Sequence, residues 1–358
     1  MPSVEVRNLC KSFGDLKVLN NLSFKVEDGE YAVVLGLSGC GKTTLLKTMA
    51  GLLKPGSGEI FIDGLDVTSK PTEERGIGFF FQNYALFPHM TVYDNIAYGL
   101  RLRKVPEPEV KKKVEDKLSM VGLLEWGKNM PKELSGGMQQ RVALARAISI
   151  ESKLLLLDEP LNALDAKIGA ILRLELVKMA DELGLTVIHV TPNQAEAMEI
   201  ADKMIIINDG RIAQIGSDVE VYTTPSNPFV AYFLGESNFL KASRTDFRTV
   251  KYGKNLFQLK EDVVDDEVLL AVKSEKVLFE KHDKNTLEGV VENVNFLGKT
   301  IRYEVAVTGG RVYVQTSKYP NLKASDRVSV YFPPEDILQF TSKQKLHENI
   351  SVIQYADY

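Results

Sequence analysis

The sequence predicts an α/β protein of two domains, in which a mixed or mostly parallel sheet with helices precedes a smaller β-rich domain. The 358 residues exceed the roughly 250–300 at which a single hydrophobic core stops growing. Short apolar runs alternate with helical patterns over the first part of the chain, as in parallel α/β sheets. After about residue 236 the apolar residues recur with a period of two, which is typical of β-strands.

Two unbroken apolar runs, at residues 31–35 and 154–157, have the pattern of central strands buried on both faces. Apolar residues recur at helical spacing over residues 107–122, which predicts an amphipathic helix. A second long helix is expected over residues 165–183, with Gly184 as its C-terminal stop. This alternation indicates a parallel α/β sheet.

The character of the sequence changes near residues 224–228, Thr-Pro-Ser-Asn-Pro. Beyond this point turn residues are frequent, and Gly309 and Gly310 suit a tight hairpin turn because both tolerate positive φ. We therefore expect a small β-barrel-like second domain. Its strands are expected at residues 268–272, 289–294, 301–307, 311–314 and 328–332.

Composition and charge place the chain among ordinary globular proteins, with 44% hydrophobic and 26% charged residues. The formal net charge of −4 gives no reason to expect nucleic acid as a partner, and the basic run at residues 111–113 has acidic neighbours. Two cysteines, Cys10 and Cys40, and no signal-peptide pattern at the start favour a reducing cytosol. No apolar stretch reaches the roughly 18–20 residues that a membrane helix needs, so a membrane role would require a partner.

Residues 36–44, Gly-Leu-Ser-Gly-Cys-Gly-Lys-Thr-Thr, match a phosphate loop between an apolar strand and a helical pattern. Its glycines let backbone N–H groups curl around phosphates, and the N-terminus of the following helix adds a favourable potential. Lys42 can reach the β- and γ-phosphates, and the Thr43 hydroxyl can ligate Mg²⁺. The candidate nucleotide-binding residues of this loop are Gly36, Ser38, Gly39, Cys40, Gly41, Lys42, Thr43 and Thr44.

Two acidic residues, Asp158 and Glu159, follow the apolar run at residues 154–157. Asp158 is suited to hold Mg²⁺ through water, and Glu159 to polarise an attacking water as general base. Strands often end in acidic turns, so the pair is weak evidence by itself. Beside a phosphate loop, it predicts a site of ATP hydrolysis.

Leu-Ser-Gly-Gly at residues 134–137 precedes an apolar helical run over residues 142–148. Ser135 can cap this helix, and Gly136 and Gly137 leave its N-terminal amides bare, which makes a second anion site. Because the phosphate loop already serves one nucleotide, two half-sites in one chain suggest a head-to-tail dimer in which each copy completes the other's site. Taken alone, the segment is equally well explained as an ordinary loop.

Together these motifs resemble those of the ABC ATPases, whose signature is LSGGQ, over nearly all of residues 3–235. The resemblance implies a P-loop NTPase cassette at residues 1–235, with a helical subdomain at about 88–150. It also implies an OB-like regulatory or dimerisation domain at residues 236–358. Four further features match the family. Phe13 matches the aromatic residue that stacks on adenine, and Val18 matches its neighbour against the nucleoside. Gln82 matches the glutamine that senses Mg²⁺ and the membrane subunit, and the loop from Asn162 to Asp165 matches the dimer-crossing loop.

The resemblance further implies an ATP hydrolase that uses ATP and Mg²⁺. Lys42, Gln82 and Glu159 would act in catalysis, while Thr43, Gln82 and Asp158 would hold the metal. The nucleotide would also contact Phe13, Val18 and, across the dimer, Ser135, Gly136, Gly137 and Asp165.

Residues 71–78 and 84–89 are of the type found in ATPases of binding-protein-dependent importers of sugars, polyamines and iron. The partners implied are a second ATPase subunit, identical or different, and permease subunits received by residues 83–90. A solute-binding protein would take part indirectly. Such a subunit is peripheral at the cytoplasmic face of the membrane.

The chain departs from the family at three positions near the expected dimeric site. Pro192 replaces a switch histidine that contacts the γ-phosphate; it fits the first turn of the following helix but offers no side-chain donor and no N–H. Met138 replaces the glutamine of LSGGQ, and Asn162 replaces a serine. We therefore expect ATP binding with reduced hydrolysis, in a slow homodimer or beside a second, consensus ATPase. His189 is a candidate substitute for the switch histidine, with a packed core histidine as the alternative.

Two other functions remain open at this point. One is a soluble ABC ATPase of translation or DNA repair, although such proteins usually carry tandem cassettes or coiled-coil insertions. The other is a regulatory protein that binds ATP without acting as a transport motor, which Pro192 keeps open. Because an ATPase subunit does not touch the cargo, the cargo is only hinted at: residues 233–240 resemble polyamine and iron importers somewhat more than sugar importers.

Overall fold

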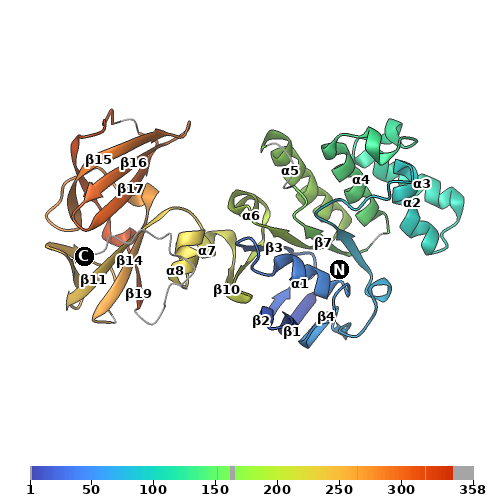
Figure 1. Ribbon diagram of the computed structural model, residues 1–358, viewed down its shortest axis with the longest axis horizontal. Helices are drawn as coiled ribbons and strands as arrows, with labels where there is room; N and C mark the ends of the chain where they lie inside the picture. The colour runs from blue at the N-terminus through green and yellow to red at the C-terminus, as the bar shows by residue number, and fades with distance from the viewer. Residues whose placement is uncertain (1, 151, 162–165, 264, 319, 342–358) are drawn as a thin grey trace. The chain divides into compact units, whose positions relative to one another are not determined.

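The computed structural model describes residues 2–150, 152–161, 166–263, 265–318 and 320–341. The chain forms two compact units, Met1–Asp218 and Val219–Tyr358, and Figure 1 shows the helices and strands of each.

The centre of the first unit is a six-stranded sheet. In spatial order the strands are β10 (Arg211–Gly216), β9 (Lys203–Asn208), β3 (Tyr31–Gly36), β8 (Thr186–Thr191), β7 (Leu154–Asp158) and β6 (Ile77–Phe80). All of its neighbouring strands pair in parallel except the edge strand β10 and its neighbour β9, which are antiparallel. The two apolar runs predicted as buried strands both lie in it, and every residue of those two strands is buried.

A second, antiparallel sheet of four strands belongs to the same unit. Its inward-facing residues alternate with exposed ones, as expected for a sheet with one face on a core. In spatial order its strands are β2 (Leu16–Val26), β1 (Val4–Phe13), β4 (Ser57–Ile62) and β5 (Leu65–Asp66).

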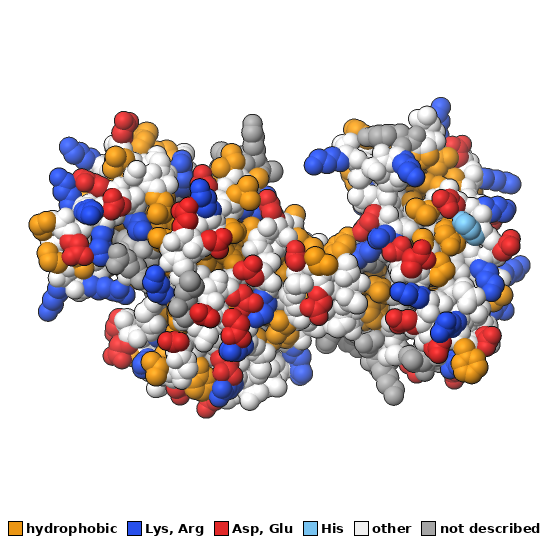
Figure 2. Space-filling view, turned by 180° about the vertical axis from the view of Figure 1, so that it is seen from behind, with side chains coloured by type: hydrophobic (Ala, Val, Ile, Leu, Met, Phe, Trp, Pro, Cys, Tyr) orange, Lys and Arg blue, Asp and Glu red, His pale blue; other side chains and the backbone are white. Residues whose placement is uncertain are grey.

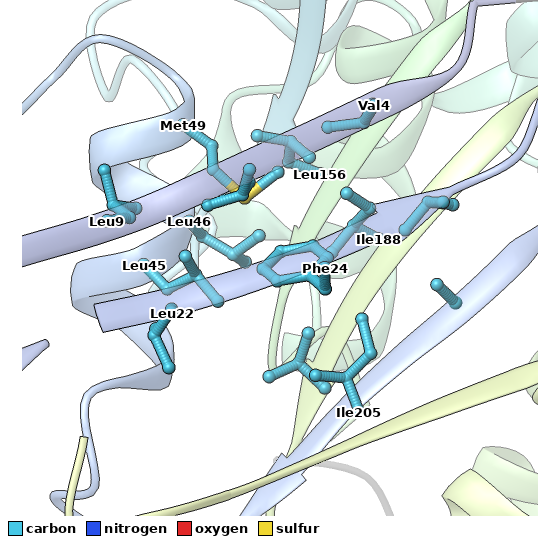
Figure 3. Close-up of a cluster of buried hydrophobic side chains, with 14 of the residues drawn as sticks. Val4, Leu9, Leu22, Phe24, Leu45, Leu46, Met49, Leu156, Ile188 and Ile205 are labelled. Carbon is cyan, nitrogen blue, oxygen red and sulfur yellow. The ribbon is translucent and has the colours of Figure 1, made fainter. Parts of the chain in front are cut away.

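The main core of the first unit lies between these two sheets and the helix α1 (Lys42–Met49). Figure 3 shows Leu45, Leu46 and Met49 of α1 gathered with Phe24 of β2 and Ile188 of β8. Burial of each large apolar side chain stabilises the fold by roughly 1.5–3 kcal/mol. This packing fixes α1, and with it the loop that precedes the helix.

Further helices complete the first unit. The long helix predicted at residues 165–183 is observed, and Gly184 with φ +58° follows its end. A separate helical region has its own apolar core and includes the helix predicted at residues 107–122. That region contains α2 (Val92–Leu102), α3 (Glu107–Met120), η2 (Leu124–Trp126), η3 (Pro131–Glu133) and α4 (Gly136–Ser149). The others are η1 (Thr72–Glu74), α5 (Ala166–Leu183) and α6 (Gln194–Ile200).

The second unit contains two antiparallel sheets around one apolar core. All five strands predicted from the period-two pattern are present. One sheet has the order β13 (Asn255–Gln258), β12 (Thr249–Tyr252), β11 (Ser237–Asp246), β14 (Glu267–Lys273) and β19 (Leu338–Thr341). The other has the order β17 (Gly310–Thr316), β16 (Ile301–Val307), β15 (Thr286–Phe296) and β18 (Arg327–Tyr331), and the short helices are η4 (Ser274–Lys276) and η5 (Pro334–Asp336).

The predicted hairpin is present, but its turn lies one residue earlier than expected. Val307 pairs with Gly310, so the two turn residues are Thr308 and Gly309. Gly309 has φ +95°, which only glycine adopts at little cost. Gly310 instead begins β17.

Two short helices, α7 (Asp218–Thr223) and α8 (Pro228–Phe233), precede the strands of the second unit. The family resemblance implied a boundary at residues 235/236, whereas the two compact units divide at residues 218/219, so α8 falls within the second unit. One reason is that the buried Lys273 of β14 donates to the carbonyl oxygen of Ala231 at 3.1 Å.

No helix among the described residues is long and apolar enough to cross a membrane. On the face shown in Figure 2, Lys and Arg side chains are interspersed with Asp and Glu. This mixture accords with 44 basic and 48 acidic residues in the chain.

Candidate active site

The phosphate loop, residues 36–44, joins β3 to α1. Gly39 and Gly41 have φ of +82° and +105°, in the region that favours glycine. A Cβ at Gly41 would also lie 2.9 Å from the carbonyl oxygen of Val18. The loop therefore depends on glycine at this position, and it sits at the N-terminus of α1, where unpaired N–H groups attract anions.

Lys42 is only 4% exposed, and its Nζ donates to the carbonyl oxygens of Gly36 and Leu37, each at 2.9 Å. The next residue, Thr43, donates from Oγ1 to Oδ1 of Asp158 at 2.8 Å. This bond connects the start of α1 to the end of β7. The structure thus brings together the phosphate loop and the acidic pair.

Asp158 and Glu159 lie where β7 ends. Burial raises the pKa of the Asp158 carboxyl; the bond from Thr43 opposes the rise, and the charge of Glu159 adds to it, so that the net pKa is above its usual value. A carboxylate in this environment is stabilised by a cation beside it.

Glu159 itself has φ +49°, in the left-handed region. Its backbone N–H donates to the carbonyl oxygen of Val190 on β8 at 2.9 Å. Such a backbone costs on the order of 1 kcal/mol or more in a non-glycine residue, and it persists only where neighbouring structure enforces it.

Gln82 follows β6, which is the neighbour of β7 in the sheet. Its Nε2 donates to Oε2 of Glu159 at 2.7 Å, although the two residues are 77 apart in sequence. The carboxyl ends of parallel strands meet at one edge of the sheet, which explains why residues after β6 and β7 meet. Three of the predicted site residues, Asp158, Glu159 and Gln82, are therefore adjacent at this edge.

Phe13 and Val18 lie at the hairpin that joins β1 to β2. Phe13 is 49% exposed, so it is a surface aromatic and not a core residue, and Lys11 Nζ lies 5.1 Å from the centre of its ring. Val18 is half-buried and packs on the main core, and its Cγ1 would lie 3.3 Å from a Cβ at Gly41. Val18 therefore lies directly beside the phosphate loop, with Phe13 at the tip of the same hairpin.

The remaining residues of the loop support its shape. A Cβ at Gly36 would lie 2.3 Å from the carbonyl oxygen of Ile207, so the loop packs closely against β9. Cys40 is buried, and burial raises the pKa of its thiol. Ser38 is exposed, whereas Thr44 is half-buried, and its carbonyl accepts from Thr48 Oγ1 at 2.7 Å.

Ser135 is the N-cap of α4, as the sequence predicted. Its hydroxyl accepts from the N–H of Met138 at 3.4 Å, and a Cβ at Gly136 would meet open space. Met138 packs against the core of the helical region. Among the described residues, no hydrogen bond or ion pair joins Ser135, Gly136 or Gly137 to the phosphate loop. Asn162 and Asp165, predicted in the dimer-crossing loop, lie outside the described residues.

Known proteins are similar to this chain in sequence. The spermidine/putrescine import ATP-binding protein PotA of Thermotoga maritima is 39% identical over 354 residues, which covers 93% of this chain and 96% of that protein. The chain belongs to the ABC transporter family. The Fe(3+) ions import ATP-binding protein FbpC of Photobacterium profundum is 40% identical over 309 residues, covering 85% of this chain and 87% of that protein. The sulfate/thiosulfate import ATP-binding protein CysA of Pseudomonas syringae pv. tomato is 50% identical over 242 residues, 66% of this chain and 74% of that protein.

The family model "ABC transporter" matches residues 19–162, and the model "TOBE domain" matches residues 270–340. Among solved structures, the dimeric post-hydrolysis state of the ATP-binding cassette MJ0796 bound to ADP and Pi aligns with a TM-score of 0.55 at 32% identity. It covers 60% of this chain and 98% of that chain. The protein is therefore an import-type ABC ATPase, an ATP hydrolase coupled to transport, whose P-loop cassette is followed by an OB-like TOBE domain.

The residues of this ABC cassette fit ATP and Mg²⁺. The hydroxyl of Thr43 and the carboxylate of Asp158 supply adjacent oxygen donors, which Mg²⁺ prefers. No group of three or more His, Cys, Asp or Glu side chains in the described part could hold a metal by itself. The oxygens of the nucleotide phosphates would complete the ligands of an ion at this site.

The position of Pro192 differs from the prediction. The first turn of α6 begins at Gln194, and Asn193 is its N-cap, with a side chain that accepts from the N–H of Glu196 at 3.2 Å. Pro192 thus lies before the helix and not in its first turn. The short Asn193 side chain is a good cap, and it displaces the helix start by two residues.

His189 does not replace the switch histidine. It is fully buried on β8, with Nδ1 3.0 Å from Tyr31 Oη and Nε2 3.2 Å from Glu196 Oε1. The alternative of a packed core histidine is confirmed. Sequence patterns did not single out Tyr31, Thr191 or Glu196, because their contacts come from three different elements.

The loop at residues 83–90 is held by two side chains. The buried Asn95 of α2 accepts from the N–H of Phe87 at 2.8 Å and donates to its carbonyl oxygen at 3.1 Å. Arg146 of α4 donates to the carbonyl oxygens of Tyr84 and Ala85, both of which have positive φ. The aromatic rings of Phe87 and Tyr98 are in contact, 4.7 Å between centroids.

Proposed function

We propose that this chain is the peripheral, cytoplasmic-face subunit that binds and hydrolyses ATP to power solute import by an ABC transporter. One observation carries the proposal: Thr43 bonds to Asp158, and the adjacent Glu159 bonds to Gln82. These contacts join a phosphate loop, a cation ligand and a general base at one edge of the sheet. The names of the relatives, each an import ATP-binding protein, support the coupling to import.

In the proposed mechanism the Lys42 ammonium leaves the carbonyl oxygens that now hold it and binds the β- and γ-phosphates. Thr43 would ligate Mg²⁺, Asp158 would hold the ion through water, and Gln82 would be a further ligand. The bound ion would supply positive charge for the phosphates. Glu159 accepts the proton of the attacking water as general base, and its bond with Gln82 keeps the carboxylate in place.

The nucleotide is proposed to lie between two ATPase subunits. Phe13 would stack on adenine and Val18 would pack against the nucleoside, while Ser135, Gly136 and Gly137 of the second subunit approach the γ-phosphate, with Asp165 in the crossing loop. Among the residues that the structure describes, no hydrogen bond or ion pair joins Ser135 to the phosphate loop, which accords with this division. The related cassette MJ0796 is described as dimeric both in its post-hydrolysis state and in a second structure.

The permease is proposed to bind beside the loop at residues 83–90. Asn95 and Arg146 hold this loop, and Gln82, which touches Glu159, immediately precedes it. A displacement of the loop would therefore move Gln82, and through its hydrogen bond the general base Glu159. The relatives are named for polyamine, ferric iron and sulfate import, at 39–50% identity, so these similarities do not single out one cargo.

The replacement Pro192→His is expected to raise the rate of ATP hydrolysis by about 10²–10³-fold, because one hydrogen-bond donor to the transferred phosphoryl group is worth about that much. ATP affinity is expected to stay within about twofold, since Lys42 and the loop glycines are unchanged. Single-turnover phosphate release by the full chain with Mg²⁺, beside ATP titration calorimetry, measures both.

The same experiment separates a motor from a regulatory ATP-binding protein. A transport ATPase shows slow, Mg²⁺-dependent turnover that Pro192→His accelerates. A chain that binds ATP but releases no phosphate, with or without the replacement, would instead favour the regulatory function.

A further inference from the structure

A buried polar cluster adjoins the acidic pair: Tyr31 on β3, His189 and Thr191 on β8, and Glu196 on α6. None of these four residues is more than 4% exposed. Tyr31 Oη lies 3.0 Å from His189 Nδ1, and His189 Nε2 lies 3.2 Å from Glu196 Oε1. Thr191 Oγ1 donates to the other oxygen, Glu196 Oε2, at 2.7 Å.

Glu196 is the charged member of this cluster. Burial pushes the pKa of its carboxyl upward, but His189, Thr191 and the charge of Arg173 together hold the pKa below its usual value. Burial also raises the pKa of Tyr31, which therefore stays protonated and can donate to His189. A buried carboxylate is destabilising unless it is paired, and apolar side chains of similar volume often replace such a pair without loss of stability. Packing alone therefore does not require these residues.

The cluster ends at the β8–α6 corner, residues 190–193. The hydroxyl of Thr191, held by Glu196, accepts from the N–H of Asn193 at 3.0 Å. Val190, one residue after His189, accepts from the N–H of Glu159 at 2.9 Å. The cluster thus holds the corner through Thr191. The corner in turn holds the left-handed backbone of Glu159 through Val190.

We infer that His189 is a positioning residue for hydrolysis: with Tyr31 and Glu196 it holds the β8–α6 corner, and through Val190 it holds Glu159 in its strained conformation. This inference rests on the proposed role of Glu159 as general base. The corner contains Pro192, which has no hydrogen-bond donor, and the cluster holds the corner through the bonds of Thr191 to Glu196 and Asn193. His189 is fully buried, so it acts only through its neighbours.

The double variant His189→Phe with Glu196→Met tests the inference in the full-length chain. It replaces the pair by apolar side chains of similar volume, so its melting temperature is expected to match that of the parent. The single-turnover rate of ATP hydrolysis is nevertheless expected to fall about tenfold, because small displacements of a catalytic group are costly. The Kd for ATP should not change, since the phosphate loop is untouched. A stable double variant with the parental rate would overturn the inference.

Tyr31→Phe provides a second test, which does not require the double variant to fold. It removes one hydroxyl and retains the ring, and it should lower the rate about threefold at unchanged Kd, by loosening the His189 ring. A parental rate in Tyr31→Phe contradicts the inference even if the double variant fails to fold. Glu159→Gln serves as the reference variant. If Glu159→Gln keeps full activity, Glu159 is not the general base. If Glu159→Gln is inactive but the cluster variants keep the parental rate, only the positioning role of His189 is rejected.

Discussion

Replacement of Glu159 by Gln is expected to lower the rate of ATP hydrolysis by about 10²–10⁴-fold, the usual contribution of a general base. Gln keeps the shape of the side chain and can still accept the bond from Gln82, now 2.7 Å long, but it cannot take a proton from water. ATP binding should persist, because Lys42 and Thr43 are unchanged. Phosphate release and ATP titration, measured on the same preparation, separate the two effects.

Glu182→Gln is the matched control, since this carboxylate is exposed on α5 and, among the described residues, forms an ion pair with Lys178 at 3.7 Å. It should leave both rate and affinity at the parental values. Near-parental hydrolysis by Glu159→Gln would show that another group accepts the proton.

Lys42→Ala should weaken ATP binding by about 10–100-fold, because hydrogen bonds to charged groups contribute roughly 1.5–3 kcal/mol each. The same replacement removes the donor for the carbonyl oxygens of Gly36 and Leu37. The free energy of unfolding without nucleotide should therefore fall by about 1–2 kcal/mol. Calorimetric titration with ATP and denaturant unfolding measure the two changes.

Lys54→Ala is a suitable control, because this exposed lysine lies beyond the end of α1 and outside the loop. It should alter neither the Kd for ATP nor the stability. An unchanged Kd in Lys42→Ala would remove the phosphate loop from the account of nucleotide binding.

The sequence predicted those parts of the site that are contiguous motifs. The loop at residues 36–44 needs glycines and a lysine for reasons that hold in any protein, and Asp158 and Glu159 follow an apolar run that has the pattern of a buried strand. The contact between Gln82 and Glu159 could not be derived from composition or spacing, because it depends on which strands are neighbours in the sheet. Only the family resemblance pointed to Gln82.

The errors also have physical reasons. Pro192 was placed in the first turn of α6 because proline suits that position, but Asn193 competes as a cap and prevails. His189 could be recognised as a strand residue, whereas Tyr31 and Glu196, its partners, are 158 and seven residues away in sequence and meet it only in the fold. The turn before Gly310 shifted because strand register, and not the glycine pair, sets the position of a hairpin turn.

The central claim is that the nucleotide site is completed by the Ser135 segment of a second subunit. Sedimentation of Glu159→Gln with and without ATP tests it most directly, since blocked hydrolysis should preserve the closed state. The account predicts that ATP raises the dimeric fraction. The added replacement Ser135→Asp, which keeps an N-cap oxygen for α4 but repels phosphate, should abolish this increase while the chain still binds ATP. A Ser135→Asp protein that dimerises as readily with ATP would contradict the account.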